Sequence, residues 1–265
     1  MPKLETIPVA LTVAGSDSGG GAGIQADLKT FASLGVHGTS AITCITAQNP
    51  KRVLAVQPCR PEIVRRQLEA LLEALPPAAA KTGMLYSAEI IGVVARFFQT
   101  HREVPLVVDP VMISTSGTRL LKRAAVQLLK CRLLPLATLV TPNLEEAEVL
   151  TGRNLKSIED LRGAAKHIYR EFRCAALVKG GHLRHSRDAV DIFFDGENEL
   201  LLTAPFIKGV QTHGTGCTYS AAITGFLARG DALPEAVAQA KEHISQAIAR
   251  SNAVAQHSVL NNFWR

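Results

Sequence analysis

A glycine-rich turn that ends in a cysteine is the part of the sequence best suited to chemistry. It reads QTHGTGC over residues 211–217, follows an expected strand at 200–204 and runs directly into an expected helix at 218–229. Glycines let a backbone turn tightly and approach a ligand closely. The free N–H groups and the dipole at a helix start favour an anion, most naturally a phosphate. The pattern therefore predicts a phosphate site built from backbone groups.

Cys217 lies where this helix is expected to begin. The positive field of a helix N-terminus lowers the pKa of a thiol, so a thiolate of Cys217 would be stabilised there. The alternative is a structural turn capped by Thr215, because glycine marks turns in general. The turn alone leaves both interpretations open.

A second glycine-rich loop lies near the N-terminus. It reads SDSGGGAG over residues 16–23, after an expected buried strand at 9–14 and before an expected helix at 24–34. Strand, glycine loop and helix in this order open many nucleotide-binding folds. The spacing is neither that of a P-loop, since no Gly-Lys-Ser/Thr follows, nor a clean dinucleotide fingerprint. We therefore expect the backbone to approach a ligand here, while the loop alone does not say which ligand.

Six polar side chains lie at or near the ends of expected strands. They are Asp17, Gln48, Asp109, Asn143, Lys179 and Cys217. Ligands of parallel sheets sit outside the carboxyl ends of the strands, so these residues are expected to converge. The set suits phosphoryl transfer, which needs positioning and charge neutralisation more than covalent chemistry. Asp109 and Glu146 are oxygen ligands of the kind Mg²⁺ prefers, and Lys179 could contact a nucleotide phosphate.

Several of these residues have a structural alternative. Asp109 precedes a proline and could simply start a turn. Asn143 could cap the helix that follows it, with Glu146 as the third residue of a capping box. The loop histidines His182 and His213 have no spacing that joins them as metal ligands, which favours polar loop roles.

The elements that must position these residues alternate between strand and helix along nearly the whole chain. We expect one α/β domain over residues 1–265, with a mainly parallel central sheet and helices on both faces. The Asp-Gly pair at 195–196 predicts a hairpin between strands at 190–194 and 200–204. A long final helix at 233–254 precedes an irregular tail, and a Ser/Thr/Gly loop at 114–118 could move.

Composition narrows the class of protein. The formal charge is +6, but the basic residues are scattered, whereas a nucleic-acid-binding face shows clustering. The five cysteines are an odd number without paired or zinc spacing, which indicates a reduced, cytoplasmic chain. No signal peptide is evident, and no apolar run reaches the roughly 20 residues of a membrane helix. We therefore expect neither a nucleic-acid partner nor a membrane.

Eight blocks of sequence, in order, resemble the bacterial hydroxymethylpyrimidine/phosphomethylpyrimidine kinases of the ribokinase-like superfamily. They are AGSDS at 14–18, GGAGIQADLKT at 20–30, AQN at 47–49, KTGM at 81–84, VDPVM at 108–112, TPNLEEA at 141–147, VKGGH at 178–182 and HGTGC at 213–217. The long match at 20–30 and the turn ending in cysteine are the most specific. The resemblance implies a ribokinase-like three-layer α/β/α fold.

The resemblance also implies a reaction. With ATP and Mg²⁺, such an enzyme phosphorylates 4-amino-5-hydroxymethyl-2-methylpyrimidine, a thiamine precursor, and then the resulting monophosphate. A pyridoxal or pyridoxine kinase of the same superfamily is the alternative, and a homodimer is expected. A ligand-binding or regulatory protein on the same fold would be a different class, against which intact Asp109, Lys179 and Cys217 argue. The tail after residue 254 lacks the glycine-rich ending of many members, and we expect no fused thiamine-phosphate synthase domain.

Residue roles follow from the same resemblance. Gly15, Asp27 and Gln48 are expected to face the pyrimidine; Asn143, Lys179 and His213 the ATP; Asp109 and Glu146 the magnesium ion; and Gly214, Thr215, Gly216 and Cys217 to form the catalytic turn. A glutamine amide offers both a donor and an acceptor to an aminopyrimidine edge. Cys217 stands where sugar kinases of the superfamily carry an aspartate base, and a thiolate could replace it or only shape the anion site.

Overall fold

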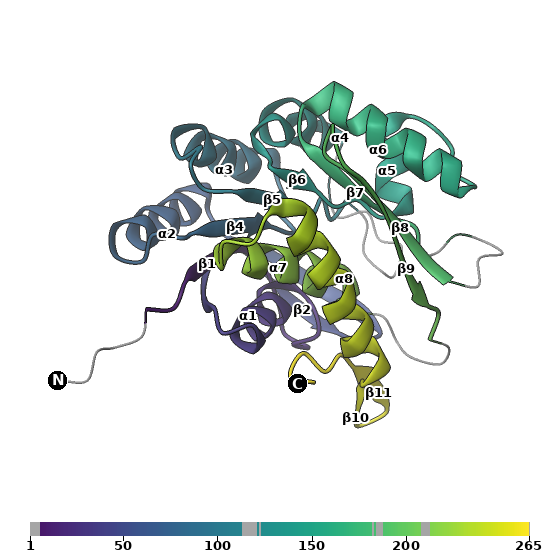
Figure 1. Cartoon of the computed structure of the whole chain (residues 1–265). Coiled ribbons are helices and arrows are strands. Elements are labelled where there is room, and N and C mark those ends of the chain that lie inside the picture. The colour runs from purple at the N-terminus through teal and green to yellow at the C-terminus, as the bar shows by residue number, and fades with distance from the viewer. Residues whose placement is uncertain are drawn as a thin grey trace.

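A nine-stranded sheet forms the centre of the molecule (Figure 1). The computed structural model describes residues 6–112, 121, 123–181, 183, 188–207 and 213–264. The strands lie in the order β3-β2-β1-β4-β5-β6-β7-β8-β9. Their bounds are β1 Val9–Asp17, β2 His37–Asn49, β3 Arg52–Pro58, β4 Ala79–Thr82, β5 Leu106–Val108, β6 Leu139–Val140, β7 Ala175–Lys179, β8 Asp188–Phe194 and β9 Glu199–Pro205, with a separate hairpin of β10 Asn252–Val254 and β11 His257–Val259.

The sheet is mainly parallel, as predicted. β2, β1, β4, β5, β6 and β7 pair in parallel with their neighbours. β3 at one border, and β8 and β9 at the other, run antiparallel. The predicted turn joins β8 to β9, and its Gly196 has a φ of 105°, a conformation that favours glycine. The parallel strands therefore end together at one edge, between two antiparallel borders.

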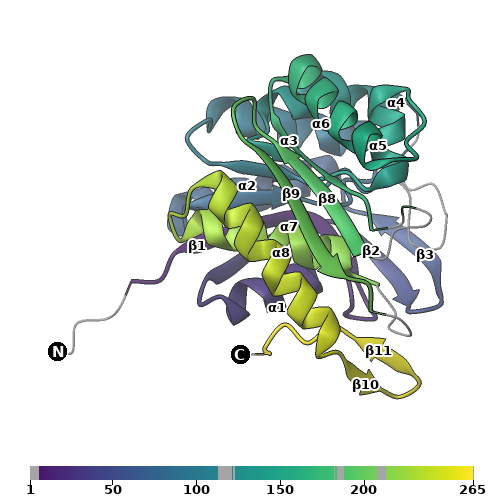
Figure 2. The same ribbon diagram turned by 45° about the vertical axis from the view of Figure 1, so that its right-hand side comes forward.

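Helices cover both faces of the sheet, which confirms the three-layer α/β/α prediction (Figures 1 and 2). One layer holds α1, α7 and α8, and the other holds α2 to α6. The helix bounds are α1 Gly23–Ser33, α2 Pro61–Ala74, α3 Ala88–Thr100, α4 Arg123–Leu128, α5 Leu144–Thr151, α6 Ile158–Phe172, α7 Thr215–Ala228 and α8 Leu233–Ala249. α1 and α7 begin at the two glycine-rich loops, so both loops open on the same side of the sheet.

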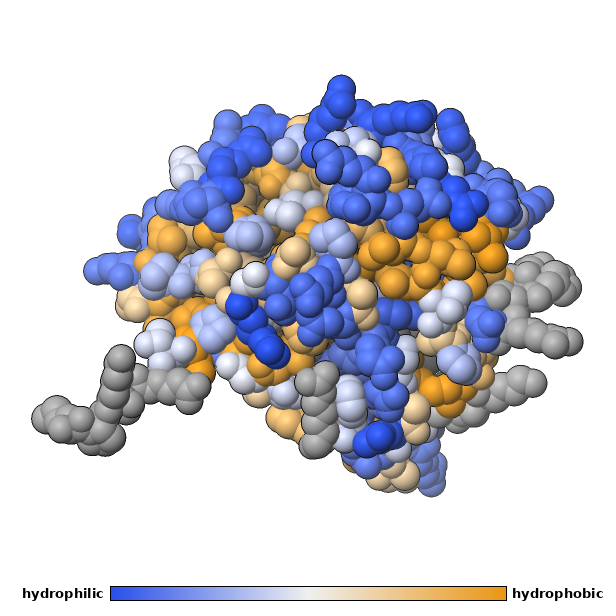
Figure 3. Space-filling model, in the orientation of Figure 1, coloured by the Kyte–Doolittle hydropathy of each residue, from blue (hydrophilic) through white to orange (hydrophobic). Residues whose placement is uncertain are grey.

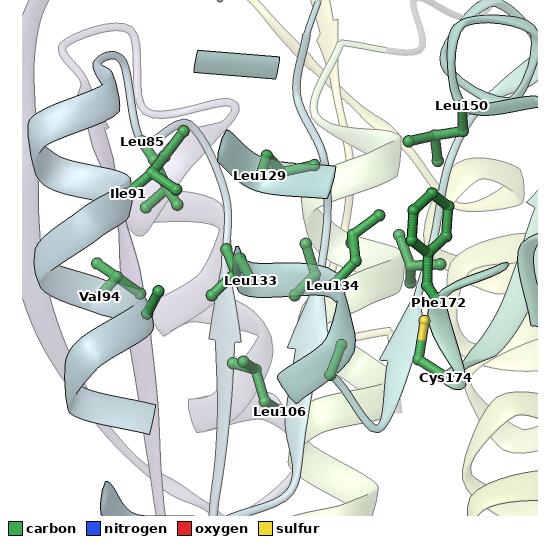
Figure 4. Packing of buried hydrophobic residues seen from close by; sticks show 14 of the residues in the cluster. Leu85, Ile91, Val94, Leu106, Leu129, Leu133, Leu134, Leu150, Phe172 and Cys174 are labelled. Atoms are coloured by element: carbon green, nitrogen blue, oxygen red, sulfur yellow. The ribbon is translucent and has the colours of Figure 1, made fainter. Parts of the chain in front are cut away.

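Short apolar strands supply side chains to two cores. Leu106 and Val108 of β5 belong to the core under α2 to α6, whereas Val107 belongs to the core under α1, α7 and α8. This alternation is the period of two that a strand buried on both faces requires. Figure 4 shows Val94 of α3 and Leu133 facing each other in the first core. Each such buried side chain contributes about 1.5–3 kcal/mol, so the cores hold the strand ends firmly in place.

The C-terminal tail is ordered, which corrects the prediction of a helix to residue 254 and an irregular tail. α8 ends at Ala249, and the chain then forms the β10–β11 hairpin, turning at Ala255 with a φ of 53°. Trp264 packs against the core under α7 and α8. The guanidinium of Arg250 lies 5.4 Å from the Trp264 ring and donates to the Trp264 carbonyl at 2.9 Å. These contacts return the tail to the helix that it leaves.

Some predicted features lie outside the described residues, namely His182, the loop at 114–118 and residues 211–212 of the glycine turn. Among the helices that the structure describes, none is long and apolar enough to cross a membrane. Figure 3 shows a mostly hydrophilic surface over α6 and an apolar area beside β8 and β9. Leu201 and Phe206, on and just after β9, are exposed apolar residues.

Candidate active site

The two glycine-rich loops lie against each other. Gly214 precedes α7 with a φ of 84°, and a Cβ on it would lie 1.8 Å from the carbonyl oxygen of Gly21. A Cβ on Gly21 would in turn lie 2.9 Å from the His213 ring. Only bare backbone fits this contact, which confirms that the loops converge. The N-cap is Gly214 without a side-chain hydrogen bond, so the predicted cap, Thr215, is instead the first residue of the helix.

Asp17 organises the first loop. Its carboxylate accepts hydrogen bonds from the backbone N–H groups of Gly19, Gly21 and Ala22 at 2.8–3.1 Å. His213 Nε2 lies 3.2 Å from the same carboxylate and 3.2 Å from Nε2 of Gln48. Burial alone would raise the pKa of Asp17, but the bonds from His213 and the backbone outweigh it and lower that pKa. His213, predicted to face ATP, thus lies between Asp17 and the Gln48 side of the site.

Asp109 and Lys179 face the start of α7. Lys179 Nζ lies 3.4 Å from Asp109 Oδ1, and Ser220 Oγ donates to Asp109 Oδ2 at 3.3 Å. A Cβ on Gly216 would lie 3.3 Å from Lys179 Nζ and 3.8 Å from Asp109 Oδ2. The backbone of Gly216 therefore lies directly against the Lys179 ammonium and the Asp109 carboxylate. Three of the strand ends and the glycine turn meet here, counting Asn143, which bridges to Lys179.

Glu146 has the structural role considered above. Asn143 Oδ1 accepts from the Glu146 N–H at 2.9 Å, and Glu146 Oε2 accepts from the Asn143 N–H at 3.0 Å, which confirms the capping box at the start of α5. Glu146 Oε1 accepts from the Met112 N–H at 3.0 Å. Burial, followed by the negative charge of Asp109, raises the pKa of Glu146 to about 7. Each of its oxygens is already an acceptor.

A cavity of about 890 Å³ joins these groups. Every predicted site residue except Asp27 lines it: Gly15, Gln48, Asp109, Asn143, Glu146, Lys179, His213, Gly214, Thr215, Gly216 and Cys217. The cavity is also lined by apolar side chains, namely Val53, Val56, Met84, Val111, Ile207, Ile244 and Ile248. A concave site with apolar walls and a few convergent polar groups is typical of small-molecule binding.

Comparison with protein families identifies the chain. Residues 17–261 match the family model described as phosphomethylpyrimidine kinase. The chain belongs to the phosphomethylpyrimidine kinase family. It is 43% identical over 255 residues to the hydroxymethylpyrimidine/phosphomethylpyrimidine kinase of Bacillus subtilis, covering 96% of this chain and 94% of that protein.

This phosphomethylpyrimidine kinase family member is also similar to a bifunctional protein and to a solved pyridoxal kinase structure. It is 50% identical over 238 residues to the bifunctional thiamine biosynthesis protein of Geobacter sulfurreducens, covering 90% of this chain but about half (48%) of that protein. Among solved structures, the ADP complex of Bacillus subtilis pyridoxal kinase is similar at a TM-score of 0.90 and 38% identity, covering 97% of this chain and 98% of that one. The fold is therefore the ribokinase-like α/β fold shared by both kinds of kinase.

The pKa of the Cys217 thiol is shifted in the direction opposite to that expected from the helix start. It lines the cavity floor deep in the molecule, and burial raises the pKa of its thiol to about 11 although the residue keeps some exposure to the cavity. Lys81 lowers this pKa, whereas Asp27 and Asp109 raise it further. In this kinase-family site, desolvation therefore outweighs the stabilisation of a thiolate by the helix start.

Asp27 reaches the cavity only through another residue. It is fully buried, and its carboxylate accepts from Lys81 Nζ at 2.8 Å and from Thr12 Oγ1 at 2.6 Å. Burial alone would lower the pKa of Lys81, but the charge of the adjacent Asp27 carboxylate outweighs it and raises that pKa. Lys81, and not Asp27, lines the cavity. The sequence offered one overlooked signal, which was Lys81 directly after the three alanines at 78–80.

A second buried pair supports the other end of the cavity. Lys241 Nζ on α8 lies 2.8 Å from Asp191 Oδ2 on β8 and also donates to the Ala189 carbonyl at 3.0 Å. Asp191 Oδ1 accepts from the Gly180 N–H at 3.1 Å, next to Lys179. Sequence reasoning missed this pair, because its members lie in a strand next to the sheet edge and in a distant helix, with no shared motif.

The carboxylate of Asp109 is suited to hold a magnesium ion at this site. No group of three or more His, Cys, Asp or Glu side chains in the described part of the chain is arranged to hold a metal ion. Asp109 presents two oxygens beside Lys179 and Ser220. Glu146 lies near enough for the negative charge of Asp109 to raise its pKa. Mg²⁺ commonly binds through one or two carboxylates together with water and substrate phosphates. The donor set fits that mode rather than an all-protein cage.

Proposed function

We propose that this protein transfers the γ-phosphoryl group of ATP to the hydroxymethyl group of 4-amino-5-hydroxymethyl-2-methylpyrimidine, and then phosphorylates the monophosphate. The observation that carries the proposal is the bare backbone of Gly216 at the start of α7, which faces Lys179 and Asp109 inside one cavity. Backbone N–H groups at a helix start stabilise the charge of a transferring phosphoryl group. Family membership and the kinase names of its relatives support the same reaction.

The two substrates would occupy opposite parts of the cavity. Gln48 and Gly15 would take the pyrimidine, with Val53 and Met84 as apolar walls. The amide of Gln48 can pair with both a ring nitrogen and the amino group. ATP would lie toward Asn143 and Lys179, and the ADP complex of the related pyridoxal kinase supports nucleotide binding on this fold.

Asp109 would hold Mg²⁺, with Glu146 contributing through water. The ion would neutralise charge on the phosphate oxygens when bound. Lys179 would neutralise further charge, and the turn at 214–217 would exclude water from the phosphoryl group. Cys217 could accept the proton of the attacking hydroxyl or remain a neutral part of the anion site. Lys81 is the cation that favours its deprotonation.

ADP release tests the proposal directly. Purified protein would be assayed with ATP, Mg²⁺ and one of three acceptors, namely hydroxymethylpyrimidine, its monophosphate or pyridoxal. We expect turnover with both pyrimidines and less with pyridoxal. Greater turnover on pyridoxal would favour the pyridoxal kinase alternative, which the structural similarity to such a kinase keeps in view. Binding of pyrimidine with no ADP release from any acceptor would indicate a non-catalytic protein.

The remaining expectations concern the whole protein. We propose a single domain over residues 1–265, a cytoplasmic location, a small-molecule substrate without a nucleic-acid or membrane partner, and a homodimer. Exposed Ile45 and Leu54, 56% and 61% accessible, lie on the paired strands β2 and β3 and support self-association there. Light scattering of the purified chain would test the dimer, and a monomeric mass at micromolar concentration would contradict it.

A further inference from the structure

Val111 has a backbone conformation that a β-branched residue rarely adopts. Its φ is +41°, in the left-handed region, and it lines the cavity directly after Asp109 and Pro110. Such a conformation is a genuine outlier for valine and costs free energy. Strain of this kind persists only where the surrounding structure imposes it, and it gathers at functional sites.

The side chain of Glu146 is bonded to the residue that follows Val111. Glu146 is 2% exposed, and its Oε1 accepts from the N–H of Met112, the residue after Val111. Its Oε2 accepts from the N–H of Asn143 at the end of the neighbouring strand β6. One buried carboxylate thus ties the loop after β5 to the loop after β6. The Met112 side chain is itself buried at 2% exposure, which anchors the far side of the strained residue.

We propose that Glu146 is a positioning residue that holds Val111 in its strained conformation as a wall of the pyrimidine site, and so joins the acceptor and nucleotide sides. This inference rests on the proposed function for the identity of the acceptor. The hydrogen bond from Met112 to Glu146 fixes the backbone conformation of Val111. The hydrogen bond from Asn143 to Glu146 fixes the position of the loop that faces the nucleotide. Loss of the first bond lets Val111 relax and opens the wall.

The first test measures strain without any ligand. Asparagine tolerates the left-handed region far better than valine, so Val111→Asn should raise Tm by about 2 °C or more. The matched control is Val53→Asn, because Val53 also lines the cavity half-buried but lies in the regular strand β3. Asparagine is unfavourable in strands, so the control should not raise Tm. An equal change in both variants would overturn the assignment of strain.

The second test separates the tie from the capping box. Glu146→Asp keeps the carboxyl group, and Asp160 already completes a capping box at the equivalent position of α6 in this chain. The shorter side chain should keep the bond to Asn143 and lose the bond to Met112. In that background, Val111→Asn should raise Tm by less than half as much as in the wild type. A fully additive double variant would show that Glu146 does not hold Val111.

The third test links the tie to substrate. Calorimetry with hydroxymethylpyrimidine, without nucleotide or Mg²⁺, removes any contribution of Glu146 through a metal ion. Glu146→Asp should raise the Kd about tenfold, which corresponds to a loss of about 1.4 kcal/mol of binding free energy. An unchanged Kd would overturn the proposal. If the wild type itself does not bind the pyrimidine, the proposed function fails, while the Tm cycle still decides whether Glu146 holds Val111.

Discussion

At the scale of single residues, the site combines groups that favour an anion with groups that oppose one. The start of α7 and the cations Lys81 and Lys179 favour negative charge, whereas Asp109 and the buried Asp27 oppose it. Both kinds of group act on the pKa of Cys217, but burial is the largest effect and keeps its thiol protonated near pH 7. A proton-accepting role for Cys217 therefore requires the bound substrates to change its surroundings.

Replacing the thiol tests that role. We expect Cys217→Ser to retain ATP affinity, since the backbone N–H groups and Lys179 remain, and to lose about 10²–10⁴-fold in kcat if the sulfur takes the proton. Steady-state ADP release and nucleotide titration would measure the two effects separately. Unchanged turnover would remove Cys217 from the chemistry and leave the backbone as the main contributor.

Asp17 predicts a pH dependence of stability. Its pKa is lowered in the folded protein, so its contribution is present above the unfolded value of about 3.9 and is lost as pH falls through the lower folded value. We expect Asp17→Asn to destabilise the protein by about 1.5–3 kcal/mol at pH 7, the value of hydrogen bonds to a charged group. Denaturant unfolding of both proteins should show this difference shrinking below about pH 4. A difference independent of pH would mean that the charge is not what the loop needs.

At the scale of elements, each glycine loop depends on the other for its shape. Gly214 has no room for a side chain because the Gly21 carbonyl lies against it. The helix start that would receive the phosphoryl group is therefore placed by a loop at the far end of the sequence. α1 and α7 pack together behind this contact.

Gly214→Ala should lower kcat by about 10²–10³-fold, the usual effect of losing an aligned donor. The new methyl group would push the turn away from Gly21. Gly230→Ala is the matched control, because Gly230 also has a positive φ, of 95°, and follows the same helix, but a Cβ there meets no atom within 4 Å. It should lose about 1 kcal/mol or more of stability through backbone strain with little change in kcat. Equal losses of kcat in the two variants would contradict a specific role for the turn.

Elements and loops were predictable where the signal is local. Glycine turns, the Asp-Gly hairpin and the order of strand and helix each lie within a few adjacent residues, and all are present. The Asp27–Lys81 and Asp191–Lys241 pairs were not predictable, because each joins side chains from distant segments whose separation only the fold determines. The same reason applies to Cys217, whose protonation depends on how many protein atoms surround it. Whether Asp27 or His213 contacts a ligand stays a prediction.

At the scale of the whole molecule, the C-terminal tail supports the cavity from outside. α8 presents Ile244 and Ile248 to the cavity, while Trp264 packs against the core beneath the same helix. Trp264→Ala should reduce the free energy of unfolding by about 1–3 kcal/mol through lost apolar contact. It should also raise the KM for ATP more than that for the pyrimidine. Thermal unfolding and ADP release would check both, and an equal rise in the two KM values would argue against a link between tail and nucleotide.

The two antiparallel borders of the sheet have a consequence for how such an enzyme can change its substrates. Val53 and Val56 on β3 line one end of the cavity, and Ala189 and Ala204 on β8 and β9 line the other, with the parallel strands between them. The strands that carry Asp109 and Lys179 lie between these two borders. We therefore expect acceptor selectivity to vary with β3 and donor selectivity to vary with β8 and β9, at opposite borders of the same parallel sheet.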